Sequence, residues 1–293
     1  MSENFWILCG KPEHWSIALK DELWGLIPKF KGKWKYLHQG DWLFFYANNP
    51  VKGVIGLGKT QAKFRQNQPL WPDEISRKEV LYPFRLEFES EYVLSQEEWK
   101  TKKIKISLPI GFYSGMNLLD DQDIIDKLRA AMKQQWGTQF EHETELEIAK
   151  PKPSEEHGAG EVLELSHDKV KDIVFEIGKM HRYITDKEYV INEDRLDVVW
   201  RRVEKSVPTY AFEIQIGGDL YHALAKLKHA YDIWNSNIYI VTAEEHRSKI
   251  EELLAGTFHE IRNVLNIINL KHISDLYSLQ LRDAKLRKEI GLP

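Results

Sequence analysis

Two acidic residues have a type and a spacing that suit catalysis. Each lies in a run of residues with the pattern of a β-strand. Asp197 lies in the run 195–200 and Glu213 in the run 209–216. Side chains alternate between the faces of a strand, so each carboxylate is set among apolar neighbours, where a lone charge is costly. Two such carboxylates brought together would repel one another unless a cation lay between them. We therefore predict that they bind a hard divalent ion, Mg²⁺, with Mn²⁺ as the alternative.

The elements that must position these residues follow an α/β pattern. Ser166 and Asp219 each precede a run with helical character, as helix-capping residues do. We expect helices over 167–183, 219–234, 244–255 and 272–290, and strands over 188–191, 195–200, 209–216, 237–242 and 264–270. This order, α-β-β-β-α-β-α through residue 255, predicts a sheet flanked by helices.

The runs RLDVVW (195–200) and AFEIQ (211–215), with the helices before and after them, resemble the PD-(D/E)XK nuclease core over about residues 166–245. The resemblance implies an α/β domain with a mixed sheet flanked by helices. It also implies a Mg²⁺-dependent hydrolase that acts on phosphodiester bonds. In its terms Asp197 and Glu213 bind the metal, and Glu176 on the preceding helix adds a carboxylate.

One position departs from that family. Gln215 stands where lysine is usual, and glutamine supplies no positive charge to the water or to the transition state. Some restriction-type members carry glutamine there, and Lys226, on the next predicted helix, could supply the charge instead. Two other interpretations stay open at this stage: Asp194 as the metal ligand, or Asp197 as a residue of an edge strand or bulge.

The N-terminal part of the chain has a different, mainly β pattern. We expect strands over 5–9, 42–47, 51–59 and 80–89, and helices over 17–24 and 121–135. The third strand holds glycines that often let another backbone or a ligand come close: Gly53, Gly56 and Gly58. We expect three of the tryptophans to be core residues: Trp6, Trp42 and Trp99. Four lysines alternate around Trp34 and suit either a solvated strand face or a rim that contacts phosphates: Lys29, Lys31, Lys33 and Lys35.

An ordered set of residues in this part resembles an EVE domain, a PUA-superfamily β-barrel with short helices that is related to YTH readers. The set is Phe5-Trp6, Pro12–Trp15, Leu23–Gly25, Gly40-Asp41, Phe44–Tyr46, Gly53–Gly56, Trp71 and Tyr82-Pro83. The resemblance covers about residues 3–140. It implies that the domain flips a modified base into a pocket walled by aromatic side chains.

By motif order, Trp24 follows the first helix and matches one wall of the pocket, and Trp71 matches a second. Trp15 and Tyr82 are alternatives for the third wall, and Asn48 stands where such readers place polar pocket residues. Stacking on aromatics is worth roughly 1–3 kcal/mol per base and offsets the cost of flipping. The competing interpretation is that these tryptophans simply belong to the core.

An acidic segment separates the two patterns. Residues 141–165 carry many glutamates, with prolines and glycines but little apolar periodicity. They predict a linker between a reader domain (1–140) and a nuclease domain (166–293).

Composition sets further limits. The single cysteine, Cys9, excludes a disulfide framework and a zinc site built from cysteines. A net charge of −4 excludes a wholly basic coat. No apolar run approaches the roughly 20 residues of a spanning helix, so we expect a cytoplasmic protein that is not in a membrane.

Taken together, a modified-base reader joined to a nuclease predicts a modification-dependent DNA endonuclease. The base it reads is expected to be 5-methylcytosine or 5-hydroxymethylcytosine, and the partner is double-stranded DNA. Because one active site cuts one strand, a duplex break also predicts a homodimer. Two alternatives remain: a factor that binds or cleaves RNA, and a non-catalytic binding protein whose nuclease fold has decayed.

Overall fold

The computed structural model describes residues 4–109, 111–137 and 166–291. The chain divides into two compact units, Met1–Ala62 with Tyr82–Glu164, and Lys63–Leu81 with Leu165–Pro293. The predicted first domain spans all of 1–140, whereas in the structure the stretch Lys63–Leu81 groups with the second unit. The predicted linker, 141–165, lies outside the described residues.

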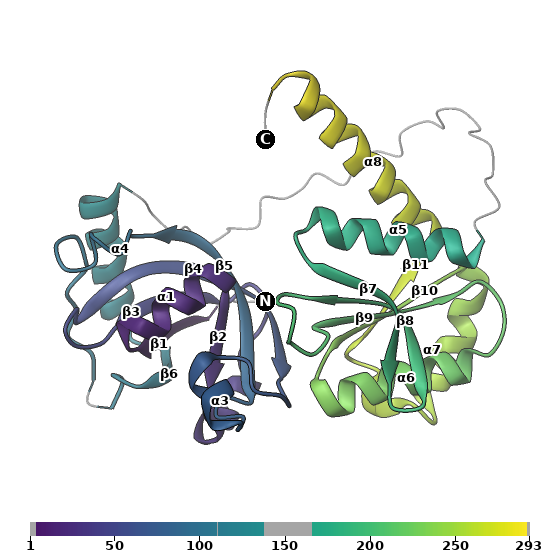
Figure 1. Cartoon of the computed structure of the whole chain (residues 1–293), viewed down its shortest axis with the longest axis horizontal. Coiled ribbons are helices and arrows are strands. Elements are labelled where there is room, and N and C mark those ends of the chain that lie inside the picture. The colour runs from purple at the N-terminus through teal and green to yellow at the C-terminus, as the bar shows by residue number, and fades with distance from the viewer. Residues whose placement is uncertain (1–3, 110, 138–165, 292–293) are drawn as a thin grey trace. The chain divides into compact units, whose positions relative to one another are not determined.

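A six-stranded mixed sheet dominates the N-terminal part (Figure 1). Its spatial order is β2-β5-β4-β3-β1-β6. β1 and β3 pair in parallel, and the other pairings whose register is resolved are antiparallel. The strands are β1 (Phe5–Gly10), β2 (Leu23–Leu26), β3 (Trp42–Ala47), β4 (Gly53–Arg65), β5 (Phe84–Val93) and β6 (Gly115–Leu119).

Close approach of backbones explains two of the glycines in β4. A Cβ on Gly58 would lie 2.3 Å from the carbonyl oxygen of Glu89 in β5, and one on Gly56 would lie 2.7 Å from that of Tyr92. The predicted close neighbour of this strand is therefore the backbone of β5 rather than a ligand. Trp6, Trp42 and Trp99 are buried, as predicted.

The short helices of this part differ from the predicted ones. The first helix, α1, is Pro12–Asp21, and Trp24 lies in β2 rather than in a helix. Pro12 explains the early start, because proline suits the first turn, and Glu22 in left-handed backbone ends the helix. The run 29–35 is helical too, as η1 (Pro28–Phe30) and α2 (Lys31–Lys35). The strand-face interpretation of its lysines is therefore wrong.

Two further helices complete this stretch of the chain. α3 (Pro72–Arg77) was not predicted, and Trp71 caps its N-terminus. α4 (Gln122–Trp136) lies within one residue of its predicted range, because Asp121 caps it by accepting hydrogen bonds from the amides of Asp123 and Ile124.

The second unit contains a five-stranded mixed sheet in the order β11-β10-β9-β8-β7. β7, β8 and β9 pair antiparallel, and β9, β10 and β11 pair in parallel. The strands are β7 (Ile184–Ile191), β8 (Asp194–Arg201), β9 (Tyr210–Gln215), β10 (Asn237–Thr242) and β11 (Leu265–Asn269). The predicted order of helices and strands from 166 to 255 is confirmed.

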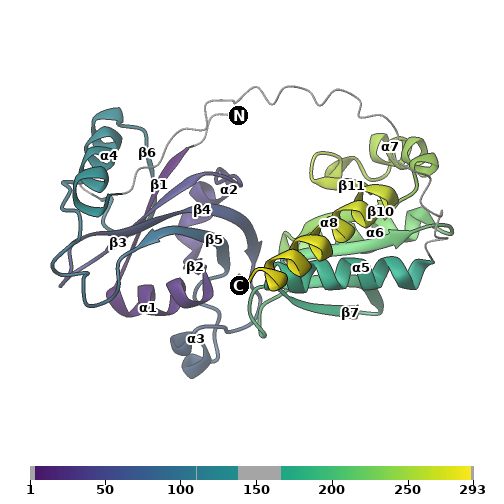
Figure 2. The ribbon, with the colours of Figure 1, turned by 90° about the horizontal axis from the view of Figure 1, so that it is seen from above.

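Helices cover both faces of this sheet (Figures 1 and 2). α5 (His167–Met180) and α8 (Leu270–Glu289) lie on one side, and α6 (Leu220–Trp234) and α7 (Arg247–Ala255) lie on the other. Val174, Ile177 and Ile273 from the first pair pack on Val198 and Phe212 of the sheet. The remaining short elements are the turns η2 (Glu244–His246) and η3 (His259–Ile261).

Strand and helix ends in this unit shift by a few residues from the predictions. α5 ends at Met180 rather than at 183, and β7 begins four residues earlier than expected. α8 begins at Leu270, where Asn269 caps it by accepting a hydrogen bond from the Lys271 amide. In the described part of the chain, no helix combines the length and the apolar character that crossing a membrane would need.

Candidate functional site

The backbone pairing between strands β8 and β9 stops where the two predicted carboxylates lie. Their paired register ends at Val198–Phe212, and Asp197 and Glu213 would form the next pair. Instead, the Ile214 amide donates a hydrogen bond to Oδ2 of Asp197 at 2.8 Å. The Asp197 amide in turn donates to Oε1 of Glu213 at 3.2 Å. Side-chain oxygens thus replace the backbone ladder at this point, while β9 stays paired to β10 as far as Gln215.

Both carboxylates are buried, which makes their charge costly. Asp197 is 8% exposed and Glu213 only 2%. Burial, helped by the neighbouring charge of Asp197, raises the pKa of Glu213 to about 8 against the pull of Lys226. The pair therefore needs positive charge close by in order to be fully ionised at neutral pH.

Lys226 supplies one such charge from α6. Its Nζ forms an ion pair with Oε2 of Glu213 and donates to the Arg195 carbonyl oxygen at 2.9 Å. The structure thus brings together three of the predicted residues: Asp197, Glu213 and Lys226.

A second group of residues, which was not predicted, reaches the two carboxylates from the face of the sheet that α5 covers, opposite α6. Lys171 of α5 has its Nζ 3.4 Å from Oδ1 of Asp197 and also forms an ion pair with Glu188 of β7. His167, the first residue of α5, has Nε2 3.4 Å from Oδ2 of Asp197. Burial by itself lowers the pKa of Lys171, but Glu188 and Asp197 outweigh it and raise that pKa above its usual value.

The sequence did contain a signal for these residues. His167 and Lys171 each stand three residues before an apolar position of the predicted helix, Val170 and Val174 respectively. Polar residues at that spacing border the buried stripe of a helix, so they are candidates for a buried ion pair. Glu188 could be found only from the strand register.

Three other predicted residues have neighbours other than the paired carboxylates. Gln215 is half-buried at the end of β9, with its side-chain nitrogen beside Gly218. Glu176 forms an ion pair with Lys179 one turn further along α5, at 3.1 Å, rather than with the pair. Asp194 begins β8 and lies 3.5 Å from Nε2 of His222. The roles predicted for these residues stay predictions.

The donor chemistry of the pair fits a hard divalent cation. Within residues 4–109, 111–137 and 166–291, no cluster of three or more His, Cys, Asp or Glu side chains could hold a metal. Mg²⁺, however, is commonly held by only one or two carboxylates together with water and substrate phosphates. Asp197 and Glu213 offer that set, and their buried negative charge favours a cation between them.

In the N-terminal part, two of the predicted base-binding residues stack on one another. Trp15 and Trp24 have ring centroids 4.1 Å apart, and both are buried. Trp15 also contacts Phe45, and its Nε1 donates to the Tyr46 carbonyl oxygen at 2.9 Å. A base cannot lie between two rings at this separation, so in this arrangement the two do not face one another as opposite walls.

The other predicted base-binding residues are spread over several elements. Trp71 is buried at the start of α3, in the stretch that groups with the second unit. Tyr82 is half-buried, with the His14 ring at its edge and the Arg85 guanidinium 5.6 Å from its centre. Asn48 follows β3, and its amide donates to the Gly10 carbonyl oxygen at 2.8 Å. Their role in base binding stays a prediction.

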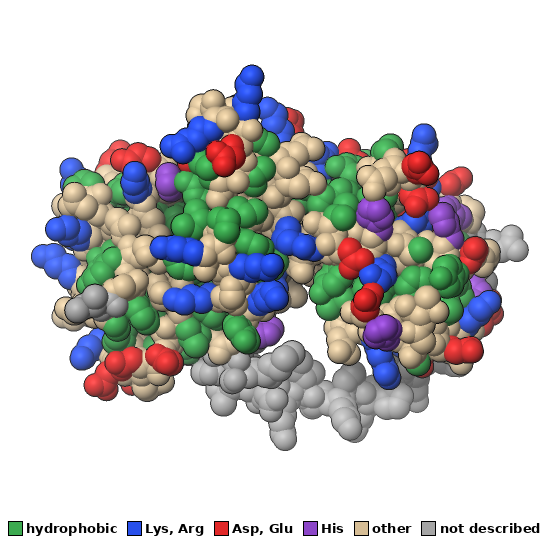
Figure 3. Space-filling model, turned by 90° about the horizontal axis from the view of Figure 1, so that it is seen from below, with side chains coloured by type: hydrophobic (Ala, Val, Ile, Leu, Met, Phe, Trp, Pro, Cys, Tyr) green, Lys and Arg blue, Asp and Glu red, His purple; other side chains and the backbone are tan. Residues whose placement is uncertain are grey.

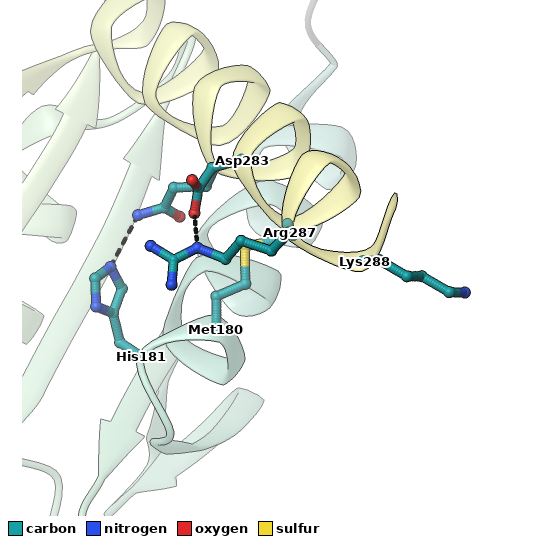
Figure 4. A pocket seen from close by; sticks show the side chains of 7 residues that line it. Met180, His181, Asp283, Arg287 and Lys288 are labelled. Atoms are coloured by element: carbon teal, nitrogen blue, oxygen red, sulfur yellow. Dashed lines mark hydrogen bonds and ion pairs between the residues drawn. The ribbon is translucent and has the colours of Figure 1, made fainter. Parts of the chain in front are cut away.

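A recess of about 560 Å³ lies at the far end of α5 from Lys171, between α5 and α8 (Figure 4). An ion pair between Asp283 and Arg287, with a distance of 2.7 Å, lies on its α8 side. Opposite, His181 and Gln280 approach within 2.9 Å. Met180 and His181 close α5, so this recess and His167 lie about 20 Å apart along the helix.

Comparison with known proteins gives only weak likenesses to solved structures. No family model matches the chain, and no curated protein matches it. Among solved structures, the YTH domain-containing protein Mmi1 in complex with RNA has 13% identity and a TM-score of 0.32, over 47% of this chain and 88% of its own.

Two bacterial structures give similar values. An ASCH protein mutant from Zymomonas mobilis has 13% identity and a TM-score of 0.28, over 44% of this chain and 98% of its own. Rpa0253 from Rhodopseudomonas palustris has 14% identity and a TM-score of 0.29, over 47% and 96%. At such TM-scores the likenesses carry no argument about this chain, and its function must be argued from the site.

Proposed function

We propose that this chain is a modification-dependent DNA endonuclease, in which a PUA-like reader of the EVE type serves a metal-dependent nuclease domain of the PD-(D/E)XK type. The observation that carries the proposal is the buried pair Asp197 and Glu213 at the parting of β8 and β9. A fold does not place two carboxylates together in its interior, at a cost in stability, unless they are matched by positive charge or a ligand.

The chemistry would be hydrolysis of a phosphodiester. Water adds across one P–O bond and leaves a phosphate monoester and a free hydroxyl. Mg²⁺ held by Asp197 and Glu213 would lower the pKa of a bound water and neutralise charge on the phosphate. Lys226 would hold Glu213 in place, and the Gln215 amide would orient the attacking water by a hydrogen bond.

The N-terminal part would supply recognition of the modified base. A reader must hold a flipped base against aromatic rings and hold the backbone by its phosphates. The helical run 28–35 carries exposed Lys29, Lys31, Lys33 and Lys35, which suit phosphate contacts. Figure 3 shows Lys and Arg side chains interspersed with hydrophobic ones on the face of this part.

A cleavage assay tests the proposal directly. The full chain is incubated with Mg²⁺ and duplex DNA carrying 5-methylcytosine, 5-hydroxymethylcytosine or plain cytosine, and separately with RNA. Cleavage of a modified duplex alone supports the proposal, and its loss in Asp197→Asn, but not in Asp194→Asn, supports the assigned site. A double-strand break that depends on protein concentration would support the proposed homodimer.

Other outcomes of the same assay identify the alternatives. Cleavage of RNA in preference to any DNA would replace the proposal with an RNA nuclease. Binding of modified DNA without cleavage in either Mg²⁺ or Mn²⁺ would show a binding protein with a decayed nuclease fold. Equal cleavage of modified and plain DNA would overturn the reader while leaving the nuclease.

A further inference from the structure

Lys171 occupies a defined place in the site although no motif assigns it a role. Its side chain is only 10% exposed. Its Nζ lies between Glu188, with which it pairs, and Oδ1 of Asp197 at 3.4 Å. An ammonium buried to this extent is costly unless it is paired, and here two carboxylates from adjacent strands pair with it.

Glu188 has an unusual backbone that serves this arrangement. The β7–β8 ladder pairs Lys187 with Val198 and Tyr189 with Leu196, so Glu188 lies opposite Asp197. Its φ of 52° is left-handed, a conformation that a non-glycine residue adopts only at a cost in free energy. In β7, this conformation falls on the residue whose carboxylate pairs with Lys171.

The cluster opens to solvent on the side of Lys171. The side chains of Glu213 and Asp197 are 3% and 11% exposed, whereas those of His167 and Glu188 are 44% and 47% exposed. The N-terminus of α5 lies on the same side, because His167 is its first residue. Helix N-termini attract phosphate groups, so a phosphodiester would approach the carboxylates past Lys171.

Building on the proposed nuclease function, we infer that Lys171 is a catalytic residue that contacts a non-bridging oxygen of the phosphodiester being cut, and that Glu188 positions it. Gln215 carries no charge, and Lys226 comes from α6, on the other face of the sheet from α5, whose first residue lies at the open side of the cluster. Lys171 has three N–H donors, of which Glu188 and Asp197 take two. The third can stabilise charge that develops on the phosphate.

Steady-state cleavage of modified duplex DNA by the full chain tests this assignment. Lys171→Met is expected to lower kcat about 100-fold or more at saturating Mg²⁺, with little change in KM. Lys171→Arg should recover part of the loss, because it restores the positive charge. Glu188→Gln should cause a smaller fall in kcat, since the lysine remains but is held less firmly.

Lys187→Met is the matched control. Lys187 neighbours Glu188 and likewise joins β7 to α5, through an ion pair with Asp172, but it does not touch Asp197 or Glu213. It should leave kcat unchanged. Thermal unfolding of each variant establishes that the chain is folded, and if Lys171→Met does not fold, the comparison rests on Lys171→Arg and Glu188→Gln.

The Mg²⁺ dependence separates a catalytic lysine from a structural counter-ion. A counter-ion competes with metal for Asp197, so its removal would lower the Mg²⁺ concentration needed for half-maximal activity while kcat is kept. That result in Lys171→Met would overturn the assignment and leave the nuclease function intact. Absence of cleavage by the wild-type chain would overturn the nuclease function and this assignment with it.

Discussion

The carboxylates of Asp197 and Glu213 each accept a backbone hydrogen bond from the other strand, between β8 and β9. The Asp197 amide donates to the Glu213 carboxylate, and the amide of Ile214, next to Glu213, donates to the Asp197 carboxylate. The two side chains therefore replace the backbone hydrogen bonds between the strands at this point. Any change in the charge of either carboxylate should be felt in the stability of the sheet as well as in the proposed chemistry.

The raised pKa of Glu213 predicts a pH-dependent stability. A carboxyl whose pKa is about 8 in the folded chain and near 4.5 in the unfolded chain binds more protons when folded between these values. The free energy of unfolding should therefore fall as the pH rises from about 5 to about 8, at about 1.4 kcal/mol per unit of pKa difference. Urea denaturation without metal, at pH 5.5 and at pH 8.5, measures it.

Glu213→Gln is the control for this prediction, because the amide keeps the shape and cannot ionise. Its unfolding free energy should lose less than that of the wild type across the same pH range. If the two proteins show the same pH dependence, Glu213 does not titrate as described.

Divalent metal should restore the stability that the wild type loses as the pH rises. Metal binds the ionised carboxylate, so Mg²⁺ must displace the Glu213 proton, and the binding weakens as the pH falls. We expect 10 mM Mg²⁺ to raise Tm by several degrees at pH 8 and by less at pH 6. Differential scanning fluorimetry measures the shift. A shift of equal size in Asp197→Asn would show that the metal binds elsewhere.

The amide of Gln215 should matter for rate and not for substrate binding. Gln215→Ala removes one hydrogen-bonding group from the site and adds no charge, so we expect kcat for cleavage to fall about 10- to 100-fold with KM kept. Gln215→Lys restores the usual residue of the resembled family, but it adds a second ammonium on the strand face of Glu213, which already pairs with Lys226, and like charges disfavour one another. Rates for both variants near those of the wild type would remove Gln215 from the mechanism.

In the N-terminal part, the Trp15–Trp24 stack should depend on the glycine beneath it. A Cβ on Gly10 would lie 2.3 Å from Cη2 of Trp24, which is itself held by Trp15. Gly10→Ala should therefore destabilise the fold by about 1–3 kcal/mol. Chemical denaturation measures the loss. Gly32→Ala, at a helical glycine with nothing within 4 Å of the added Cβ, should be neutral or stabilising.

The sequence predicted the carboxylate pair because strand alternation is a local property. Asp197 and Glu213 each sit among apolar residues at a period of two, and the capping residues Ser166 and Asp219 marked the starts of α5 and α6 correctly. Helical spacing placed Lys171 at the border of the buried stripe of α5, but its role was missed because its partner, Glu188, becomes its neighbour only through the pairing of β7 with β8. No local pattern encodes that register.

The N-terminal helices were placed less well, for a related reason. The run from Ile17 to Trp24 has apolar residues that suit a helix, but Leu23–Leu26 forms a strand because it pairs with β5. The alternating lysines from Lys29 to Lys35 have the period of a strand, yet Pro28 starts a helical turn that they continue. Pairing with a distant strand and a single proline outweighed the local periodicity in these two places.

Removing Lys226 should expose the cost of burying Glu213. Without its ammonium, the pKa of Glu213 rises further, because Lys226 is the cation that opposes burial and the charge of Asp197. In Lys226→Met the buried carboxyl should therefore stay protonated at pH 8.5, where the wild-type carboxyl is largely ionised. The loss of unfolding free energy should be larger at pH 8.5 than at pH 5.5, by about 1 kcal/mol. The double variant Lys226→Met/Glu213→Gln should show the same loss at both pH values, since the amide cannot ionise. Denaturant unfolding of the four proteins at both pH values completes the cycle, and strictly additive losses would show that Lys226 and Glu213 do not interact.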